Sequence, residues 1–260
     1  MQKIPKIIHF CWFGDKEYSN IQNICFESWK IHLPDYEFIL WNEDNSDMSH
    51  PFVKFAYEKK KFAFVADYIR LKAVYEYGGI YLDTDMFLMK NFDSLLDNFF
   101  FIGAQDSELV SAGIFGGLQK SEYIKTCLKY YEEESPMDWQ LRLAIPRILT
   151  RGFETYTERV MVNFSTIIRA KDLVVYPPEY FYPLPFDINK PFQKDFMKFA
   201  KDETIAIHLW EGSWIEYDIF QLIRRRNYLE ALRKIDFNKK LKIKFLKKCV
   251  ISLLQSIKIR

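Results

Sequence analysis

Gly78-Gly79-Ile80-Tyr81-Leu82-Asp83-Thr84-Asp85 is the stretch that decides the fold of this 260-residue chain. Upstream of it, residues 62–77 keep their apolar side chains at helical spacing. The two glycines end that helix, because glycine tolerates the left-handed backbone at which helices stop. Residues 80–82 form a short β-rich run that leads directly into two acids. The stretch therefore predicts a helix, a tight turn, a strand and an acidic loop.

The alternation of strands and helices extends toward the N-terminus. Patterns typical of strands cover residues 6–10 and 36–41, and helical patterns cover 19–32 and the residues after Pro51. Ser19 or Asn20 is the expected cap of the first helix, which ends before Pro34. Strand, helix, strand, helices and strand in this order are typical of an α/β fold with parallel strands.

Further elements are predicted along the rest of the chain. Strands are expected at 99–104, 112–118, 173–176 and 204–208, a helix at 122–133, and an ordered proline-rich loop at 176–191. We expect two parts, a catalytic domain over 1–220 and a basic amphipathic helical segment over 221–260.

The composition limits the class of protein. Hydrophobic residues make up 49% and charged residues 28%, which is typical of a globular chain with a sizeable core. Aromatic residues reach 18%, enough to supply stacking surfaces as well as core. The four cysteines form no C-x-x-C pair, and no run of about 20 apolar residues could span a membrane. With no pattern of a secretory signal, we expect a cytoplasmic protein.

The two acids of the deciding stretch indicate a metal site. Side chains alternate along an extended segment, so Asp83 and Asp85 fall on the same side. Carboxylate oxygens suit Mn²⁺ or Mg²⁺, and such a cation can neutralise a leaving diphosphate. A D-x-D triplet alone is more often a solvated turn. Its position after a buried strand favours a site, because ligands of open α/β sheets lie at that edge.

Two other segments add polar groups. Asp67 and Arg70 lie three residues apart on one helical face, so they form either an ion pair within the helix or a pair that faces the edge. His208-Leu209-Trp210-Glu211-Gly212-Ser213-Trp214 follows a predicted strand. A core histidine with packed tryptophans is the alternative there, but the density of polar and aromatic groups favours a site.

The C-terminal segment is strongly basic. Residues 221–260 contain 13 Lys and Arg against two acids, so they carry +11 and the rest carries −9 of the total +2. Apolar residues at helical spacing, namely Leu246, Cys249, Val250, Leu253, Leu254 and Ile257, form a stripe among the lysines. Either the segment packs on the body, or it lies on an anionic membrane surface. Nucleic acid is disfavoured because the body is acidic.

Five segments together resemble a known family. They are residues 4–12, Ser28-Trp29 with Trp41-Asn42, Ala66-Asp67-Tyr68-Ile69-Arg70, residues 78–85, and residues 208–214. These segments resemble the glycosyltransferases of family 32 and the sugar-binding D-x-D region superfamily. Bacterial capsule and O-antigen transferases and yeast outer-chain mannosyltransferases belong there, and clostridial glucosylating toxins are more distant relatives. The match is dense over 4–90, thin over 95–200, and returns at 204–214.

The resemblance implies a GT-A type, Rossmann-like mixed sheet flanked by helices, a nucleotide-sugar donor, a divalent metal and retention of anomeric configuration. It places His9 and Trp12 at the nucleotide and Asp67 and Arg70 at the donor sugar. It also implies that Tyr81 and Asp83 contact the donor.

The same resemblance assigns the metal and the loop that closes the site. It makes Asp85 a direct metal ligand, with His208 as a possible contact to the metal or the diphosphate. Glu211, Ser213 and Trp214 are similar to the closing loop of the toxins, although the spacing is shorter. Asp67, Arg70, Asp83 and Asp85 are thus the expected catalytic residues.

We therefore expect a metal-dependent retaining glycosyltransferase that uses a UDP-sugar. The expected acceptor is a saccharide in the form of a lipid-linked repeat unit of a capsule or O-antigen. The acceptor is expected near Asp106, Glu108 or Asp138, and the enzyme on the inner face of the cell membrane. One alternative is a binding module for nucleotide sugars or glycans with a degenerate site. A phosphatase or nucleotidase is another, disfavoured because Thr84 lies between the acids.

Overall fold

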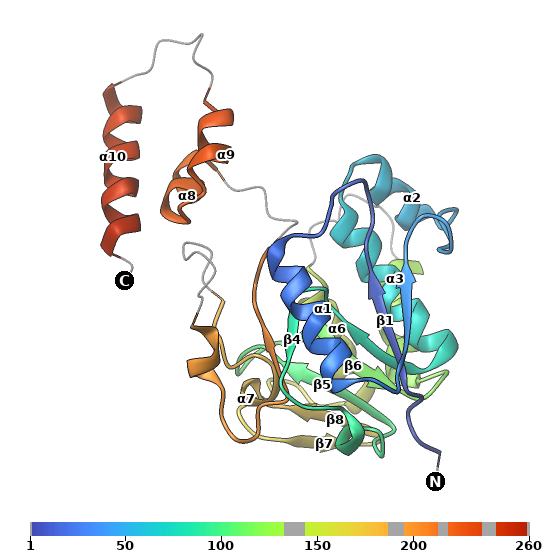
Figure 1. Ribbon diagram of the computed structural model, residues 1–260. Coiled ribbons are helices and arrows are strands. Elements are labelled where there is room, and N and C mark those ends of the chain that lie inside the picture. Colours follow the sequence, from blue (N-terminus) through green and yellow to red (C-terminus); the bar gives the residue numbers. More distant parts are fainter. Residues whose placement is uncertain (1, 133–143, 187–194, 213–217, 236–242, 259–260) are drawn as a thin grey trace. The chain divides into compact units, whose positions relative to one another are not determined.

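The computed structural model describes residues 2–132, 144–186, 195–212, 218–235 and 243–258 (Figure 1). The chain divides into two compact units. We call Met1–Leu184 with Met197–Leu209 the body, and Pro185–Phe196 with Trp210–Arg260 the helical unit. The expected division into 1–220 and 221–260 stays a prediction about domains.

A seven-stranded mixed sheet forms the centre of the body, in the order β2-β1-β3-β6-β5-β8-β7. Its strands are β1 Ile7–Cys11, β2 Glu37–Trp41, β3 Gly79–Leu82, β5 Phe100–Ala104, β6 Val110–Gly117, β7 Ile168–Ala170 and β8 Leu173–Tyr176. β1 is parallel to β2 and β3, whereas β6 is antiparallel to β3 and β5. The expected α/β fold with a mixed sheet is confirmed, and the first three strands are parallel as predicted.

A second, two-stranded sheet changes one expectation. The strand predicted at 204–208 exists as β9, Ala206–His208, but it pairs with β4, Met86–Leu88, and not with the main sheet. β4 itself was not predicted, because three residues are too few to show a period. The pairing brings the chain back to the residues that follow Asp85.

Helices cover the sheet (Figure 1). The body contains α1 Asn20–His32, α2 Pro51–Glu58, α3 Phe62–Tyr77, α4 Glu122–Glu132, α6 Ile145–Thr157 and α7 Pro178–Phe181, with short 3-10 turns at η1 Asp93–Leu95 and η2 Phe196–Phe199. α2, α3, α4 and α6 share one hydrophobic core with the sheet. In that core the rings of Tyr81, Phe115 and Phe100 stack in series across three strands. Part of the aromatic excess is therefore core.

The start of α1 and the end of α3 both follow from local sequence. Ser19 caps α1 by accepting from the Ile21 amide, and Gln22 accepts from the Ser19 amide in return. Gly78 ends α3 with a φ of 67°, and Gly79 follows with a φ of 100°. A Cβ on Gly79 would lie 2.7 Å from the carbonyl oxygen of Ile7, so only glycine fits there. This close approach allows β3 to pair with β1.

The helical unit contains α8 Ile219–Arg224, α9 Tyr228–Arg233 and α10 Ile243–Lys258. The amphipathic helix expected near the C-terminus is present as α10, while α8 and α9 were not predicted. Within the described ranges, the structure contains no helix whose length and apolar character would suffice to cross a membrane.

Candidate functional site

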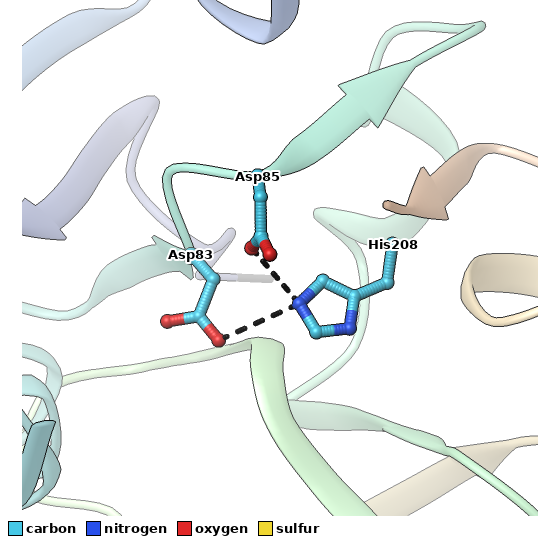
Figure 2. A group of neighbouring side chains, drawn as sticks. All are labelled: Asp83, Asp85 and His208. Atoms are coloured by element: carbon cyan, nitrogen blue, oxygen red, sulfur yellow. Dashed lines mark hydrogen bonds and ion pairs between the residues drawn. The ribbon is translucent and has the colours of Figure 1, made fainter. Parts of the chain in front are cut away.

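The site lies where β3 ends at the edge of the main sheet. The Asp83 amide donates to the Gly113 carbonyl of β6, so the strand pairing continues to the first acid. The Met86 amide then donates to the Asp83 carbonyl, which closes a tight turn over residues 83–86. The turn presents the carboxylates of Asp83 and Asp85 toward the same histidine (Figure 2).

Two buried side chains, Arg70 and Tyr81, donate hydrogen bonds to the Asp83 carboxylate. The Oδ1 atom of Asp83 accepts both bonds, from Arg70 at 3.0 Å and from the Tyr81 hydroxyl at 3.0 Å. The Arg70 guanidinium also lies 4.6 Å from the centre of the Tyr81 ring, so the two donors fix each other. The second oxygen, Oδ2, remains directed toward His208 (Figure 2).

Arg70 also binds Asp67 within α3, at 3.2 Å, and donates to the Ala112 carbonyl at 3.1 Å. Both interpretations of this pair are therefore correct in part, because it is an intrahelical ion pair that also faces the edge. Burial raises the pKa of Asp67 to about 7, against the opposing effect of Arg70. Burial would lower the pKa of Arg70, but the carboxylates of Asp83 and Asp67 raise it, so the guanidinium stays charged.

Asp85 meets His208, which lies 123 residues further along the chain. In the β4–β9 pair Met86 lies opposite His208, and the Leu209 amide donates to the Asp85 carbonyl at 2.9 Å. The backbone thus sets the His208 Nε2 atom 2.9 Å from Asp85 Oδ1 and 3.9 Å from Asp83 Oδ2 (Figure 2). Burial lowers the pKa of His208, but the two carboxylates outweigh it and the pKa is raised.

These three side chains fit a divalent cation. One ligand atom from each of Asp83, Asp85 and His208 lies within 4.8 Å of the other two. Two carboxylates and an imidazole are a donor set that Mn²⁺ accepts, and the carboxylates also suit Mg²⁺. Metal ligation needs the unprotonated imidazole, so binding would release the proton that the carboxylates favour on His208.

Two residues of α1 support the site from a distance. The Trp29 indole donates to the Met86 carbonyl at 2.7 Å, and the Ser28 hydroxyl accepts from the Leu88 amide at 2.9 Å. Both bonds hold β4 at the strand that follows Asp85. The sequence contained a signal for them, because Ser28-Trp29 is among the segments that resemble the family, but no role was assigned.

Tyr182 is a further supporting residue, and the sequence did not indicate it. Its hydroxyl accepts from the Ile114 amide at 3.1 Å, and its ring meets His208 edge-on with centres 5.6 Å apart. A Cβ on Gly113 would lie 3.0 Å from this hydroxyl and 3.3 Å from Asp83 Oδ2. Glycine at 113 therefore leaves the space into which Asp83 and Tyr182 both project.

The His9 side chain packs in the interior of the body and does not face a ligand. The ring is fully buried, its Nδ1 accepts from the Trp41 indole at 3.2 Å, and its Nε2 lies 2.8 Å from the Gly78 carbonyl. Since Nδ1 accepts, Nε2 carries the proton and donates. Burial lowers the pKa of His9. The expectation that His9 lies at the nucleotide thus needs correction, because both ring nitrogens are used to join β1, β2 and the end of α3.

Trp12 lies at the same edge, directly after β1. Its amide donates to the Trp41 carbonyl, its indole donates to the Lys16 carbonyl at 2.7 Å, and its ring packs 4.8 Å from that of Tyr18. The ring is partly exposed, which is compatible with the predicted stacking on a base. That role stays a prediction.

The remaining predicted residues fall into three groups. Ser213, Trp214 and Asp138 lie outside the described residues. Glu211 is described but belongs to the helical unit, so its predicted role in closing the site stays a prediction. Asp106 accepts from the amides of Glu108 and Leu109 and thereby shapes the loop between β5 and β6, and acceptor binding by Asp106 or Glu108 is untested.

Comparison with known proteins defines the class of this region. Residues 19–101 match the family described as "Glycosyltransferase sugar-binding region containing DXD motif". This region contains Asp67, Arg70, Asp83 and Asp85. The resemblance expected from the sequence, to glycosyltransferases with a D-x-D region, is confirmed.

The chain is similar to named relatives within that class. It is 26% identical over 150 residues to the lactosylceramide 4-alpha-galactosyltransferase of Rattus norvegicus, covering 56% of this chain and 40% of that protein. It is 29% identical over 150 residues to inositol phosphoceramide mannosyltransferase 2 of Schizosaccharomyces pombe, covering 55% and 42%. The chain thus matches about two fifths of the length of these relatives.

Solved structures of glycosyltransferases resemble the fold more distantly. The PaToxG glycosyltransferase has a TM-score of 0.49 at 18% identity, over 60% of this chain and 70% of that one. The galactosyltransferase LgtC in complex with donor and acceptor sugar analogues has a TM-score of 0.34 at 12% identity, over 93% and 99%. The fold assignment itself rests on the mixed sheet with its flanking helices.

Proposed function

We propose that the protein is a metal-dependent glycosyltransferase that moves a sugar from a nucleotide-sugar donor to a saccharide acceptor. One observation supports this most: within a body that contains the DXD region, Asp83, Asp85 and His208 converge to within 4.8 Å at a sheet edge. Such a cluster at the carboxyl end of a strand is where open α/β sheets bind ligands.

The metal would be held by Asp85 and His208, with Asp83 as third ligand. A divalent cation supplies positive charge where a leaving diphosphate develops negative charge. Arg70 acts on the same region indirectly. It is almost fully buried and bonded to Asp67, Asp83 and Ala112, so its charge fixes Asp83 in place more than it reaches a phosphate.

We propose retention of configuration by front-face attack. The acceptor oxygen forms a bond to the anomeric carbon on the side from which the diphosphate oxygen departs, and the proton of the acceptor hydroxyl passes to that phosphate oxygen. The charge that develops is stabilised by a preorganised site, which costs no reorganisation during the reaction. The residues that would stabilise this charge lie at the edge of the sheet that follows β3.

A UDP-sugar is the proposed donor, since the Trp12 loop resembles that of UDP-sugar users. A lipid-linked saccharide is the proposed acceptor. In its support, the relatives described above are named for lactosylceramide and inositol phosphoceramide, both lipids with a polar head group. Assembly of a capsule or O-antigen repeat at the inner face of the cell membrane is the proposed setting.

The test begins with a thermal-shift screen of nucleoside diphosphates and nucleotide sugars, with and without Mn²⁺. Hydrolysis of each stabilising donor is then measured for the wild-type chain, for Asp85→Asn, and for Asp44→Asn, which changes an exposed aspartate as a matched control. We expect Asp85→Asn to lose at least about 100-fold in metal-dependent turnover, since even outer partners of metal sites cost 10–100-fold. The control should keep its activity.

Three results would contradict the proposal. Full activity of Asp85→Asn in excess chelator would remove the metal from the mechanism. Donor binding by the wild-type chain without transfer or hydrolysis would indicate a binding module. Cleavage of simple phosphate monoesters, with no action on nucleotide sugars, would indicate a phosphatase.

A further inference from the structure

The C-terminal helix α10 has the reverse of the usual burial pattern. Its buried side chains include Ser252 and Ser256, which are 3% and 1% exposed. Its apolar side chains are largely outside: Ile243, Leu246, Val250, Leu253, Leu254 and Ile257 are between 41% and 73% exposed. Helices of water-soluble domains normally bury the apolar stripe and expose the polar one.

Polar contacts within the helical unit fix this orientation. Arg226 donates to the Ser256 carbonyl from two nitrogens, at 3.0 and 2.8 Å, and the Tyr228 and Ser256 hydroxyls lie 3.1 Å apart. Phe220 of α8 and Phe245 of α10 pack with ring centres 5.4 Å apart. The inner face of α10 is thus occupied by α8 and the start of α9, and the helix cannot turn its apolar stripe inward without losing these contacts.

Six of the seven exposed apolar side chains of α10 form one continuous band, and the seventh, Ile251, is 53% exposed and lies outside it. At 100° per residue, the six fall within about 100° of the helix circumference, which is the width of an ordinary core-facing stripe. α9 presents two more exposed leucines, Leu229 at 75% and Leu232 at 51%. The unit therefore displays enough apolar surface to mark an interaction site.

The charge beside this band indicates the partner. The residues of α10 include four lysines and no acid, and Lys247 and Lys248 are exposed. On the helical circumference Lys247 falls next to Leu254, so a cation borders the apolar band. A second copy of this chain would set the same lysines against each other, whereas an anionic lipid surface complements both the charge and the apolar band.

We infer that the helical unit binds the surface of an anionic membrane, with the band formed by Ile243, Leu246, Val250, Leu253, Leu254 and Ile257 immersed at the level of the head groups and Lys247 at the phosphates. This inference does not depend on the proposed catalytic function. It requires only that the outward band of α10 meets lipid.

Vesicle flotation of the full chain tests it. Wild type should float with vesicles of phosphatidylcholine mixed with phosphatidylglycerol, and much less with phosphatidylcholine alone. Val250→Gln combined with Ile257→Gln should weaken binding by about tenfold or more, because each removes a fully immersed apolar side chain. The matched control is Ile31→Gln combined with Met161→Gln, two exposed apolar residues of the body, and it should bind like wild type.

Lys247 gives a second, independent arm. Lys247→Gln should weaken binding by roughly fivefold, the effect of one charge near the surface, and the loss should shrink at high salt. Lys54→Gln, an exposed lysine of α2, is the control.

Circular dichroism on every variant establishes that each is folded. Three results would overturn the inference. The wild type would not float, or Val250→Gln/Ile257→Gln would float as well as the wild type. In the third, light scattering would show that the wild type is a dimer and that Val250→Gln/Ile257→Gln is not, with no vesicle binding by either.

Discussion

The body and the helical unit depart from the usual burial pattern in opposite ways, since the body buries charged side chains and the helical unit exposes apolar ones. The body buries ionisable groups at the end of β3, namely Asp67, Arg70 and His208. The helical unit buries Ser252 and Ser256 and leaves the apolar band of α10 outside. Ordinary domains bury apolar groups and expose charged ones, so each region departs from the rule where it does something other than fold.

The two departures differ in what compensates them. In the body, every buried charge has an opposite charge within 4 Å, as with Arg70 and Asp83 at 3.0 Å or His208 and Asp85 at 2.9 Å. The cost of burial is therefore met inside the body itself. The apolar band of α10 has no such compensation within the helical unit, which buries other residues of α10 instead. The body is thus complete as a scaffold, and the helical unit is complete only with a partner surface.

The largest effect is expected from removing the central cation. Arg70→Met should lower the free energy of unfolding by about 3 to 5 kcal/mol at pH 8, because it leaves the buried Asp67 and the half-buried Asp83 without their counter-charge. The loss should be smaller at pH 5, where Asp67 can take up a proton. Urea denaturation at both pH values measures this.

Lys72→Met on the same helix is the matched control. Lys72 pairs with Glu76 at 3.2 Å, but that pair is partly exposed to solvent, and its loss should cost under about 1 kcal/mol. Equal effects of the two substitutions would contradict the view that the body depends on its buried charges.

A smaller effect should follow from the titration of Asp67. Its pKa is raised by burial to about 7, so the native state holds a proton that the unfolded chain loses near pH 4. The resulting stability is complete below pH 4 and is lost as the pH passes 7. Asn does not titrate. Between pH 5 and 8 the wild type should therefore lose roughly 2 kcal/mol relative to Asp67→Asn.

Thermal melts of both proteins across this range provide the measurement. Parallel curves for the wild type and Asp67→Asn would show that Asp67 stays ionised throughout, with Arg70 prevailing over burial. Asp47→Asn, on an exposed loop, keeps Asp67 and should follow the wild type; a curve for Asp47→Asn that matched that of Asp67→Asn would point to another group.

The smallest effect is expected in the helical unit. Ser256→Ala removes the hydroxyl that lies 3.1 Å from Tyr228 and 2.7 Å from the Leu253 carbonyl, and should cost about 1 kcal/mol in local stability. Amide hydrogen exchange along α10 should quicken by about fivefold, while exchange in β3 should not change. Equal quickening in both regions would show that the two units unfold together.

Much of the fold was predictable from the sequence. The strand at 6–10, the helix capped by Ser19 and the helix ended by Gly78 appear within one or two residues of their expected bounds. Each depends on neighbours in sequence, through spacing, a cap or a glycine. β4, β7, α8 and α9 were missed because elements of three to six residues have no measurable period. α6 was also missed, although it is 13 residues long.

The candidate site was predictable as residue types and not as contacts. Asp83 and Asp85 follow a strand and therefore share an edge, which the alternation of side chains dictates. Tyr182 and Gly113 were missed, because their part in the site arises from space left beside Asp83 and no local pattern encodes that space. His9 was expected at the nucleotide because of its neighbours in the motif, yet its ring serves the packing of β1.

The sequence by itself determined the order of elements, the acidic turn after a buried strand and the basic, amphipathic character of the C-terminus, because these properties depend on residues a few positions apart. Only the tertiary structure decided which groups meet. The pairing of β4 with β9 brings His208 to Asp85 across 123 residues. The packing of α8 on α10 decided that serines face inward and the apolar band faces outward. Both results depend on long-range backbone and side-chain contacts, whose free energies are set by the whole arrangement and not by local spacing.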